Sequence, residues 1–294
     1  MHRRMFLAGS ALTIAKPVWA RAAGTPSASP ASGAFAHPEW FFKPIPPAAV
    51  SGHMVMFGSR KEYLAQRIPT TDYLDWPDLD LKDSSATSVE AWTTSTVATL
   101  HDHGIAVGAP LTICDWGTAY APRLFWVLTY LGSNDLAILN GGMPAWIAAG
   151  GDIESGEIVI DYVQIKDATV TPNAAVLATI DAVQQAVTEQ SAQFIDARTA
   201  AEFAKGHLPG AANVPFLANT VDSSGGVWKT AADLNSLYAD AGIDLSRPII
   251  PYCSTGVRSA ATWFTLAALG APKVSLFSGS WREWTTDPTR PVET

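Results

Sequence analysis

The 294-residue chain is poor in cysteine and in positive charge. Cys114 and Cys253 are its two thiols, so at most one disulfide could form, and the internal repeat described below places them in different halves. We therefore do not favour a structural bridge. Lys and Arg number 19 against 27 Asp and Glu, which gives a formal net charge of −8. A chain this acidic is a poor candidate for binding nucleic acid or an anionic membrane. With 48% hydrophobic and 16% charged residues, it should fold as a globular protein long enough for two domains, and we expect a monomer.

The first residues depart from this acidic character. Residues 1–22 carry four of the basic side chains and no Asp or Glu, so their removal would take the net charge from −8 to −12. Arg3 and Arg4 are followed by Met-Phe-Leu, a short apolar stretch and small residues at Ala20 and Ala22. The pattern resembles a twin-arginine export signal cleaved after Ala20 or Ala22. The apolar stretch is too short to span a bilayer. A frayed helical N-terminus or an uncleaved anchor is the alternative.

Export would place both thiols in a compartment where they could be oxidised. We expect the twin-arginine export machinery to carry the protein to the periplasm, with residues 23–39 as a flexible linker behind the signal. The periplasm is oxidising. A free thiol that persists there suggests that the thiol is used.

The chain contains an internal repeat. Shifting the first half by 138 residues places Gly104-Ile105 on Gly242-Ile243 and Trp146 on Trp284. Further upstream an offset of 140 works, and Glu62-Tyr63 falls on Glu202-Phe203. The matches are sparse, but they fall on turn glycines and aromatic residues in one order, which chance does not readily produce.

Each half of the repeat follows the same plan of strand, loop, helix and strand. This order predicts a right-handed crossover and a parallel sheet. The expected strands are 111–114, 136–139, 194–196, 249–252 and 274–277, and the expected helices are 119–131 and 258–269. The fold class is therefore α/β. We expect two tandem domains, 40–151 and 174–294, each a mainly parallel sheet flanked by helices and joined by an inter-domain segment, 152–173.

Cys253 occupies an unusual place in this plan, in the loop between a strand and a helix. Such a loop directs several backbone N–H groups at one point, and the helix dipole adds positive character there. Both features favour an anion, and a thiolate is an anion. The residues expected to form this cradle are Ser254, Thr255, Gly256, Val257 and Arg258. At the offset of 138, the position of Cys253 holds Asp115 in the first half. One half therefore has the features of a catalytic domain and the other those of a supporting domain. The alternative is a buried structural cysteine followed by an N-capping serine.

Three segments of the second half carry a family resemblance. D-A-R-T-A-A-E-F-A-K-G-H-L-P-G-A-A-N-V-P-F (196–216), Y-C-S-T-G-V-R-S-A (252–260) and G-S-W-R-E-W-T-T-D-P-T-R-P-V-E-T (279–294) are similar to the motifs of a rhodanese domain. The first half resembles the inactive N-terminal domain of two-domain members, most clearly at 120–126 and 139–151. The resemblance covers nearly everything after residue 40.

The resemblance implies sulfur transfer from thiosulfate or 3-mercaptopyruvate to cyanide or a thiol. In that family the loop cysteine attacks the donor's outer sulfur and becomes a persulfide. An acceptor then removes the outer sulfur of the persulfide. Carried over, Cys253 is the nucleophile and residues 254–258 bind the substrate. The resemblance implies no cofactor, and we expect no metal, because the aspartates between residues 72 and 83 lack the spacing of a calcium loop.

The sequence departs from the family pattern at the residues that determine which sulfur donor is used. Small residues after Cys253 are typical of mercaptopyruvate enzymes, but the histidine of their N-terminal domain is replaced here by Arg67. Arg258 stands where the family often has Thr and would suit the thiosulfate dianion, which we slightly favour. Arg67 would also favour thiosulfate if its side chain faces the substrate. We expect Arg198, with Asp196 and Glu202, to form structural charge pairs, although Arg198 could also face the substrate.

Two other functions remain open. A cysteine phosphatase or arsenate reductase would need one more residue between the cysteine and the arginine to wrap a tetrahedral oxyanion. A sulfur carrier for a protein partner would hold a persulfide without rapid turnover. The missing histidine at position 67 is consistent with the carrier hypothesis, whereas the intact cradle favours an enzyme.

Overall fold

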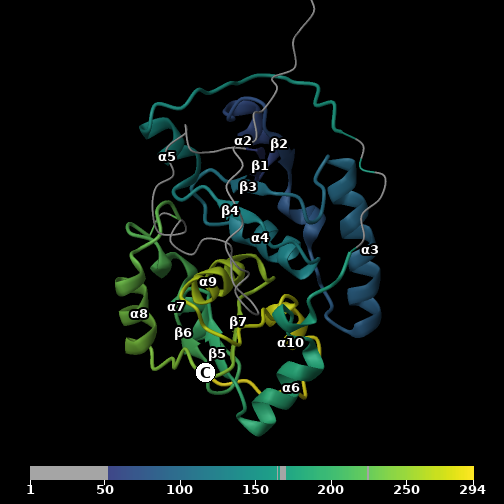
Figure 1. Cartoon of the computed structure of the whole chain (residues 1–294). Coiled ribbons are helices and arrows are strands. Elements are labelled where there is room, and N and C mark those ends of the chain that lie inside the picture. The colour runs from purple at the N-terminus through teal and green to yellow at the C-terminus, as the bar shows by residue number, and fades with distance from the viewer. Residues whose placement is uncertain (1–51, 164, 166–169, 224) are drawn as a thin grey trace, which may run out of the picture. The chain divides into compact units, whose positions relative to one another are not determined.

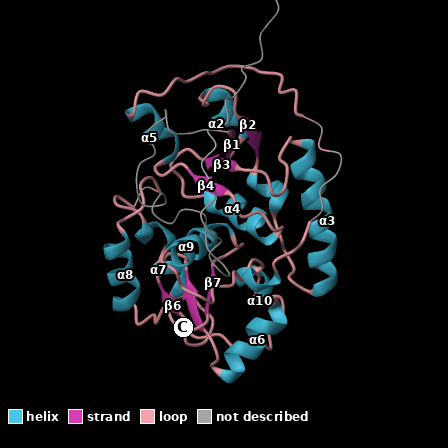
Figure 2. Cartoon of the chain, in the orientation of Figure 1, coloured by secondary structure: helices cyan, strands magenta, loops and turns pink. Residues whose placement is uncertain are grey.

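The computed structural model describes residues 52–163, 165, 170–223 and 225–294. The expected export signal, the linker behind it and residues 40–51 lie outside the described residues. The described part contains two parallel sheets with helices packed on both faces of each (Figures 1 and 2). The α/β prediction is therefore confirmed.

The first sheet contains four parallel strands in the order β2-β1-β3-β4. They are β1 (His53–Phe57), β2 (Asp72–Leu74), β3 (Leu111–Cys114) and β4 (Leu136–Ile138). Strand β3 is buried along its whole length, as its mainly apolar sequence predicts. Alternate residues of β1 belong to different cores: Val55 and Phe57 to one, Met54 and Met56 to the other.

The second sheet repeats this order with three strands, β6-β5-β7. They are β5 (Gln193–Asp196), β6 (Ala212–Asn213) and β7 (Ile249–Tyr252). The expected strand 274–277 lies beside β7 without forming a continuous strand. The Ser275 N–H donates to the Ile249 carbonyl at 3.1 Å, and the Phe277 N–H donates to the Pro251 carbonyl at 3.2 Å. This segment therefore takes the place that β4 has in the first sheet.

The helices of the described residues connect these strands. In the first half they are α2 (Arg60–Ala65), α3 (Ala86–Asp102), α4 (Ala121–Tyr130) and α5 (Gly142–Ala148). In the second half they are α6 (Ile180–Glu189), α7 (Ala200–Phe203), α8 (Ala231–Asp240), α9 (Val257–Ala268) and α10 (Ser280–Trp284). Short 3₁₀ turns occupy Trp76–Leu79, Ala174–Val176 and Phe216–Asn219.

The structure confirms the internal repeat at the level of single hydrogen bonds. Helix α2 begins with a capping box in which Ser59 and Glu62 bond reciprocally to each other's backbone N–H groups. Helix α7 begins with the same device 140 residues later, built from Thr199 and Glu202. Strands β3 and β7 start 138 residues apart. The two offsets found in the sequence are therefore the offsets between equivalent structural elements.

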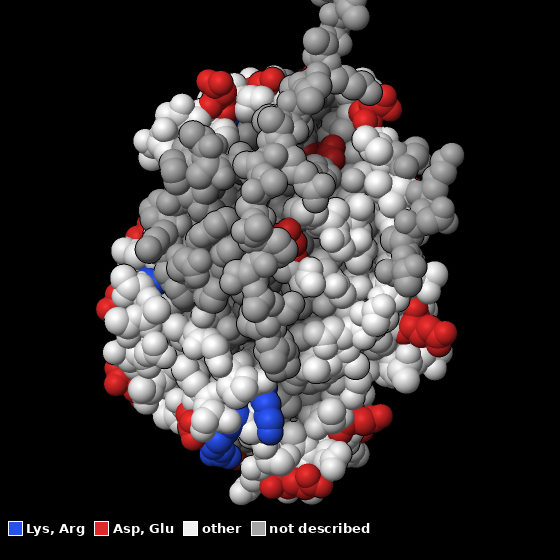
Figure 3. Space-filling model, viewed as in Figure 1, with Lys and Arg blue, Asp and Glu red and all other residues white. Residues whose placement is uncertain are grey.

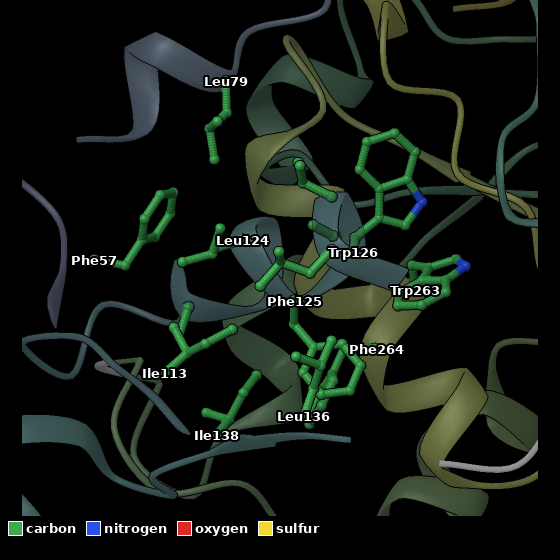
Figure 4. Packing of buried hydrophobic residues seen from close by; sticks show 14 of the residues in the cluster. Phe57, Leu79, Ile113, Leu124, Phe125, Trp126, Leu136, Ile138, Trp263 and Phe264 are labelled. Carbon is green, nitrogen blue, oxygen red and sulfur yellow. The ribbon is translucent and has the colours of Figure 1, made fainter. Parts of the chain in front are cut away.

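The two halves share one hydrophobic core. Helices α4 and α9 lie side by side between the sheets (Figure 1) and are buried on nearly all faces. Phe125 of α4 meets Phe264 of α9 edge to face, with ring centroids 5.2 Å apart. Trp126 and Trp263 are buried in the same cluster (Figure 4). Aromatic side chains from both halves thus fill one shared interior, beside smaller cores that lie within a single half.

The inter-domain segment follows the first half before it enters the second. Its Glu154 pairs with Arg67 through two backbone hydrogen bonds of 2.9 Å. Ile158 and Ile160 pack against the core on the outer face of the first sheet. The Tyr162 hydroxyl donates to the carbonyl of Tyr73 at 3.2 Å. The segment thus covers the sheet face that points away from α4.

The described surface agrees with the acidic composition. On the face shown in Figure 3, Asp and Glu side chains are scattered, most of them near the edge of the view, and most of the visible Lys and Arg side chains gather at its lower end. None of the helices in the described residues is long and apolar enough to cross a membrane.

The shared core predicts that the two halves unfold together. Replacing Phe264 with Ala should cost about 3–5 kcal/mol, because Phe264 is 1% exposed and its removal leaves a cavity. Urea unfolding followed by tryptophan fluorescence and by far-UV circular dichroism should show one transition, shifted equally for both probes. Val159→Ala, at a side chain that is 94% exposed, should stay within about 0.5 kcal/mol of the parent. Two separate transitions, with only one of them shifted, would contradict the shared core.

Candidate active site

Cys253 lies between the carboxyl end of β7 and the first turn of α9. Its side chain is completely buried. Cys253 and Cys114 are both free thiols. Cys114 packs in the core of the first half, and burial raises its pKa well above the usual range. The two thiols therefore occupy different surroundings, and only that of Cys253 adjoins a helix start.

Gly256 gives the loop its shape. Its φ of 85° lies in the left-handed region, and its N–H donates to the Cys253 sulfur at 3.1 Å. A Cβ at this position would lie 2.4 Å from the carbonyl oxygen of Ser278. Backbone conformation and close packing therefore both require glycine here. The loop can turn its N–H groups toward the sulfur only because this position has no side chain.

A serine from the next loop fixes the other side of Cys253. The Cys253 N–H donates to the Ser280 hydroxyl oxygen at 3.1 Å, and that hydroxyl donates to the Phe277 carbonyl at 2.8 Å. Ser280 adopts a φ of 59°, which is uncommon for a residue with a side chain. The strained conformation places its hydroxyl between the two backbone groups.

The environment of the sulfur favours the thiolate. Burial alone would raise the pKa of Cys253. Hydrogen bonds from the side chain and backbone of Ser259 and from the backbone of Thr255, together with the charge of Arg258, outweigh burial and lower the pKa. Of the predicted loop residues, Thr255, Gly256 and Arg258 thus act on the sulfur, and a role of the loop in binding a substrate stays a prediction.

Arg258 is held by a carboxylate that the sequence analysis placed elsewhere. Its two terminal nitrogens donate to the two carboxylate oxygens of Glu202 at 2.8 Å each, and one of them also donates to the Ser254 hydroxyl at 2.6 Å. The arginine holds the pKa of Glu202 well below its usual range. Part of the positive charge expected at the loop is therefore balanced by Glu202.

The equivalent loop of the first half holds a carboxylate. Asp115 stands in the place of Cys253, and its buried carboxylate accepts hydrogen bonds from four backbone N–H groups of its own loop. The donors are Gly117 at 2.8 Å, Thr118 at 3.4 Å, Tyr120 at 2.8 Å and Ala121 at 2.9 Å. Burial raises the pKa of Asp115, and these hydrogen bonds oppose the rise. The repeated loop is thus an anion site, which the first half fills with its own side chain.

The structure brings the predicted loop residues together but places the two predicted arginines elsewhere. Arg198 is buried and donates to the Asp196 carboxylate at 2.6 Å, and its guanidinium lies 4.4 Å from the centre of the Trp281 ring. These contacts are structural, as we expected for the pair with Asp196. Glu202 pairs with Arg258 and not with Arg198. A substrate role for Arg198 stays a prediction.

Arg67 is also buried, on the outer face of the first sheet. Its guanidinium donates to the carbonyl of Gly156 at 2.8 Å and lies over the ring of Tyr63. It therefore serves to hold the inter-domain segment. Its repeat equivalent in the second half, His207, likewise bonds to backbone carbonyl oxygen. A substrate role for Arg67 stays a prediction, and its hydrogen bonds go to the inter-domain segment rather than to the Cys253 loop.

Sequence reasoning missed three residues that contact the site: Glu202, Ser259 and Ser280. The capping box at Thr199 gave a signal for Glu202, but only for its role as a cap. The pairing of Glu202 with Arg258 joins residues 56 positions apart, and that of Ser280 with Cys253 spans 27 positions. No pattern of nearby residues in the sequence predicts either contact. The described residues contain no group of three His, Cys, Asp or Glu that could hold a metal ion.

Known proteins resemble this chain in sequence. The rhodanese-like domain family matches residues 179–287. A putative thiosulfate sulfurtransferase of Mycobacterium tuberculosis is 36% identical over 66% of this chain and 70% of its own length. The 3-mercaptopyruvate sulfurtransferase of Escherichia coli is 31% identical over 79% of this chain and 85% of its own length.

Solved structures share the fold. The anaerobic ergothioneine biosynthesis enzyme from Chlorobium limicola, in complex with trimethyl histidine, superimposes with a TM-score of 0.69 at 21% identity. The match covers 82% of this chain and 64% of that protein, so this chain spans about two-thirds of its length. At this identity the likeness concerns the fold alone.

The glycine in the loop can be tested against a matched control. Gly270, just after α9, has a φ of 84°, and a Cβ added there would meet nothing within 4 Å, so Gly270→Ala should cost about 1–2 kcal/mol of stability through backbone strain alone. Gly256→Ala adds a clash with Ser278 and should displace the N–H from the sulfur. Loss of a hydrogen bond to a charged group should slow alkylation of Cys253 at neutral pH by about 10–100-fold. Equal alkylation rates in the two variants would refute the role of Gly256.

The Arg258–Glu202 pair predicts two opposite shifts. Arg258→Met removes a cation from the thiolate, so the pKa of Cys253 should rise. Glu202→Gln removes an anion, so the pKa should fall. The pH dependence of iodoacetamide alkylation, mapped to Cys253 by peptide mass spectrometry, measures both. Glu62→Gln is the control, because Glu62 caps α2 as Glu202 caps α7 but bonds no arginine among the described residues. Shifts of the same sign in the first two variants would contradict this electrostatic assignment.

Proposed function

The chain belongs to the rhodanese family of sulfurtransferases, and we propose that it transfers a sulfane sulfur from thiosulfate or 3-mercaptopyruvate to cyanide or a thiol through a persulfide on Cys253. The observation that carries this proposal is the buried Cys253 sulfur, which receives the Gly256 N–H at 3.1 Å at the start of α9. The rest of the site supplies what a sulfur anion needs.

In the first step the Cys253 thiolate attacks the outer sulfur of the donor. With thiosulfate, a new S–S bond forms to Cys253, and the S–S bond of the donor breaks. Sulfite leaves with the electron pair. With 3-mercaptopyruvate the C–S bond breaks instead, and the thiol proton of the donor ends on the carbon of pyruvate. A thiolate is required in both cases, and the lowered pKa of Cys253 makes the thiolate more available at a given pH.

In the second step the acceptor attacks the outer sulfur of the persulfide. Cyanide leaves as thiocyanate, and the electron pair returns to Cys253 as a thiolate. Between the two steps the persulfide carries a negative charge at its terminal sulfur. The N–H groups of the loop and the dipole of α9 stabilise that charge without moving, because Gly256 and Ser280 already hold the loop in place.

The choice of donor depends on two opposing features. The small residues Ser254 and Thr255 suit the loop of a mercaptopyruvate enzyme. Arg258 suits the thiosulfate dianion, but Glu202 shares its charge. We propose thiosulfate first and 3-mercaptopyruvate second. The names of the relatives in M. tuberculosis and E. coli include both donors.

The same contacts favour sulfur transfer over phosphatase or arsenate chemistry. A tetrahedral oxyanion needs an arginine free to grip two of its oxygens. Both terminal nitrogens of Arg258 are already engaged by Glu202, and one also reaches Ser254. Four residues separate Cys253 from Arg258, which suits a single sulfur better than a phosphate.

We also propose that the protein acts in the periplasm as a monomer. Support for export comes from the paired arginines and the short apolar stretch of residues 1–22, which lie outside the described residues. Fusion of these residues to a reporter that requires twin-arginine export, beside an Arg3→Lys and Arg4→Lys double variant, would test this part separately.

Intact mass spectrometry tests the proposed chemistry. Purified protein should gain the mass of one sulfur atom when mixed with thiosulfate, or with 3-mercaptopyruvate, in the absence of an acceptor. Cyanide should remove the added mass and release thiocyanate. Cys253→Ser should gain nothing, and Cys114→Ser should behave like the parent, because the pKa of the Cys114 thiol is raised and that of Cys253 is lowered.

The possible results separate the candidate functions. A persulfide that forms and turns over with cyanide supports an enzyme with small-molecule substrates. A persulfide that forms but resists cyanide supports a carrier for a protein partner. No gain of mass with either donor refutes the proposed function.

A further inference from the structure

The half without the reactive thiol contributes a buried arginine to the other half. Arg123 belongs to α4, is 1% exposed and has no carboxylate within ion-pair distance among the described residues. Its Nη1 donates to the Ser278 hydroxyl at 2.9 Å, and its Nη2 donates to the Leu79 carbonyl at 2.6 Å. Its guanidinium lies 4.9 Å from the centre of the Trp126 ring. The Nε is buried without a partner in the described part of the chain.

A buried arginine of this kind lowers the stability of a core that otherwise packs mainly aromatic side chains. A buried cation without an anion usually costs more than an apolar side chain of similar volume. Burial lowers the pKa of Arg123 to about 10, so the guanidinium is still charged at neutral pH. The negative charges of Asp80 and of ionised Cys253 oppose this decrease, and the positive charge of Arg282 adds to it. The Cys253 thiolate is therefore one of the anions that Arg123 senses.

Ser278 connects Arg123 to the loop around the thiol. Its hydroxyl accepts the bond from Arg123, and its backbone lies against Gly256, where an added Cβ would meet the Ser278 oxygen at 2.4 Å. Gly256 in turn donates to the sulfur. A continuous set of contacts thus runs from α4 of the first half to the thiol of the second.

The repeat shows that this arginine serves one loop only. At the offset of 138, the position of Arg123 holds Ala261 in α9, and that of Ser278 holds Asn140. Asn140 accepts a hydrogen bond from the Trp228 backbone at 2.9 Å and not one from an arginine. The cation is therefore present opposite the loop that carries the thiol, and its counterpart opposite the Asp115 loop is a methyl group.

We propose that Arg123 is a positioning residue for sulfur transfer, contributed by the non-catalytic half: its buried charge stabilises the Cys253 thiolate and persulfide, and its bond to Ser278 holds the Gly256 turn against the sulfur. The effect on the persulfide rests on the proposed function. The effect of Arg123 on the Cys253 thiolate can be measured without any sulfur donor, so this inference and the proposed function can fail independently.

The test compares a neutral and a charged replacement of Arg123. Arg123→Gln keeps a hydrogen-bond donor but loses the charge, whereas Arg123→Lys keeps the charge. The pH profile of Cys253 alkylation by iodoacetamide is measured for both, beside intact mass after exposure to thiosulfate. The control is Ser84→Ala, which removes hydrogen bonds to Glu283 and Ile180 between the halves without changing any charge.

The expected result is a rise of about one unit in the pKa of Cys253 in Arg123→Gln, which corresponds to about tenfold slower alkylation at neutral pH. Arg123→Lys should stay close to the parent. Ser84→Ala should lose stability in urea without moving the alkylation profile. If Arg123→Gln does not fold, Arg123→Lys decides, since a full-unit rise despite the retained charge would overturn the proposal.

An unchanged profile in Arg123→Gln, or an equal rise in Ser84→Ala, would also overturn the proposal. If the parent protein forms no persulfide while the alkylation profile shifts as expected, the proposed function fails and the link between Arg123 and the thiolate stands.

Discussion

The close approach of Gly256 to the backbone of Ser278 is the constraint on which the rest of the site depends. Because no Cβ intervenes, the loop can turn in the left-handed region and present its N–H groups to the sulfur. The helix that follows adds its dipole at the same point. Burial would otherwise keep Cys253 protonated, and it is the combined donors, with Arg258, that reverse this. Ser280, Ser278 and Arg123 then act mainly by keeping this arrangement from relaxing.

The two halves show one loop used in two ways. In the first half Asp115 places a carboxylate in the cradle and satisfies the N–H groups permanently. In the second half a thiol takes that position, and in the proposed function it accepts and releases a sulfane sulfur. A similar difference separates Glu62 from Glu202: both cap a short helix, but only Glu202 also holds an arginine of the active loop. Chemistry in the second half therefore rests on a few side chains added to a scaffold common to both.

The sequence predicts much of this because the signals are local or repeated. Strands β3 and β7 begin and end as expected, and Cys253 is recognisable from its place between a strand and a helix. The segment 274–277 is less regular than a strand pattern indicates, because it bonds both to β7 and to Val176. Glu202, Ser280 and Arg123 could not be assigned, since each reaches the loop across a long stretch of chain. Arg67 could not be placed because burial on the outer face of a sheet leaves no trace in a short motif.

The common core of α4 and α9 has a consequence for assembly. The molecule resembles a dimer whose two subunits have been joined by a peptide, with both subunits contributing side chains to one interior between them. In an ordinary dimer such an interface would weaken on dilution, and the stability of the fold would follow the protein concentration. The covalent connection replaces that concentration with a fixed effective one. The pairing of the two halves should therefore persist at any dilution, and each half is free to specialise without losing its partner.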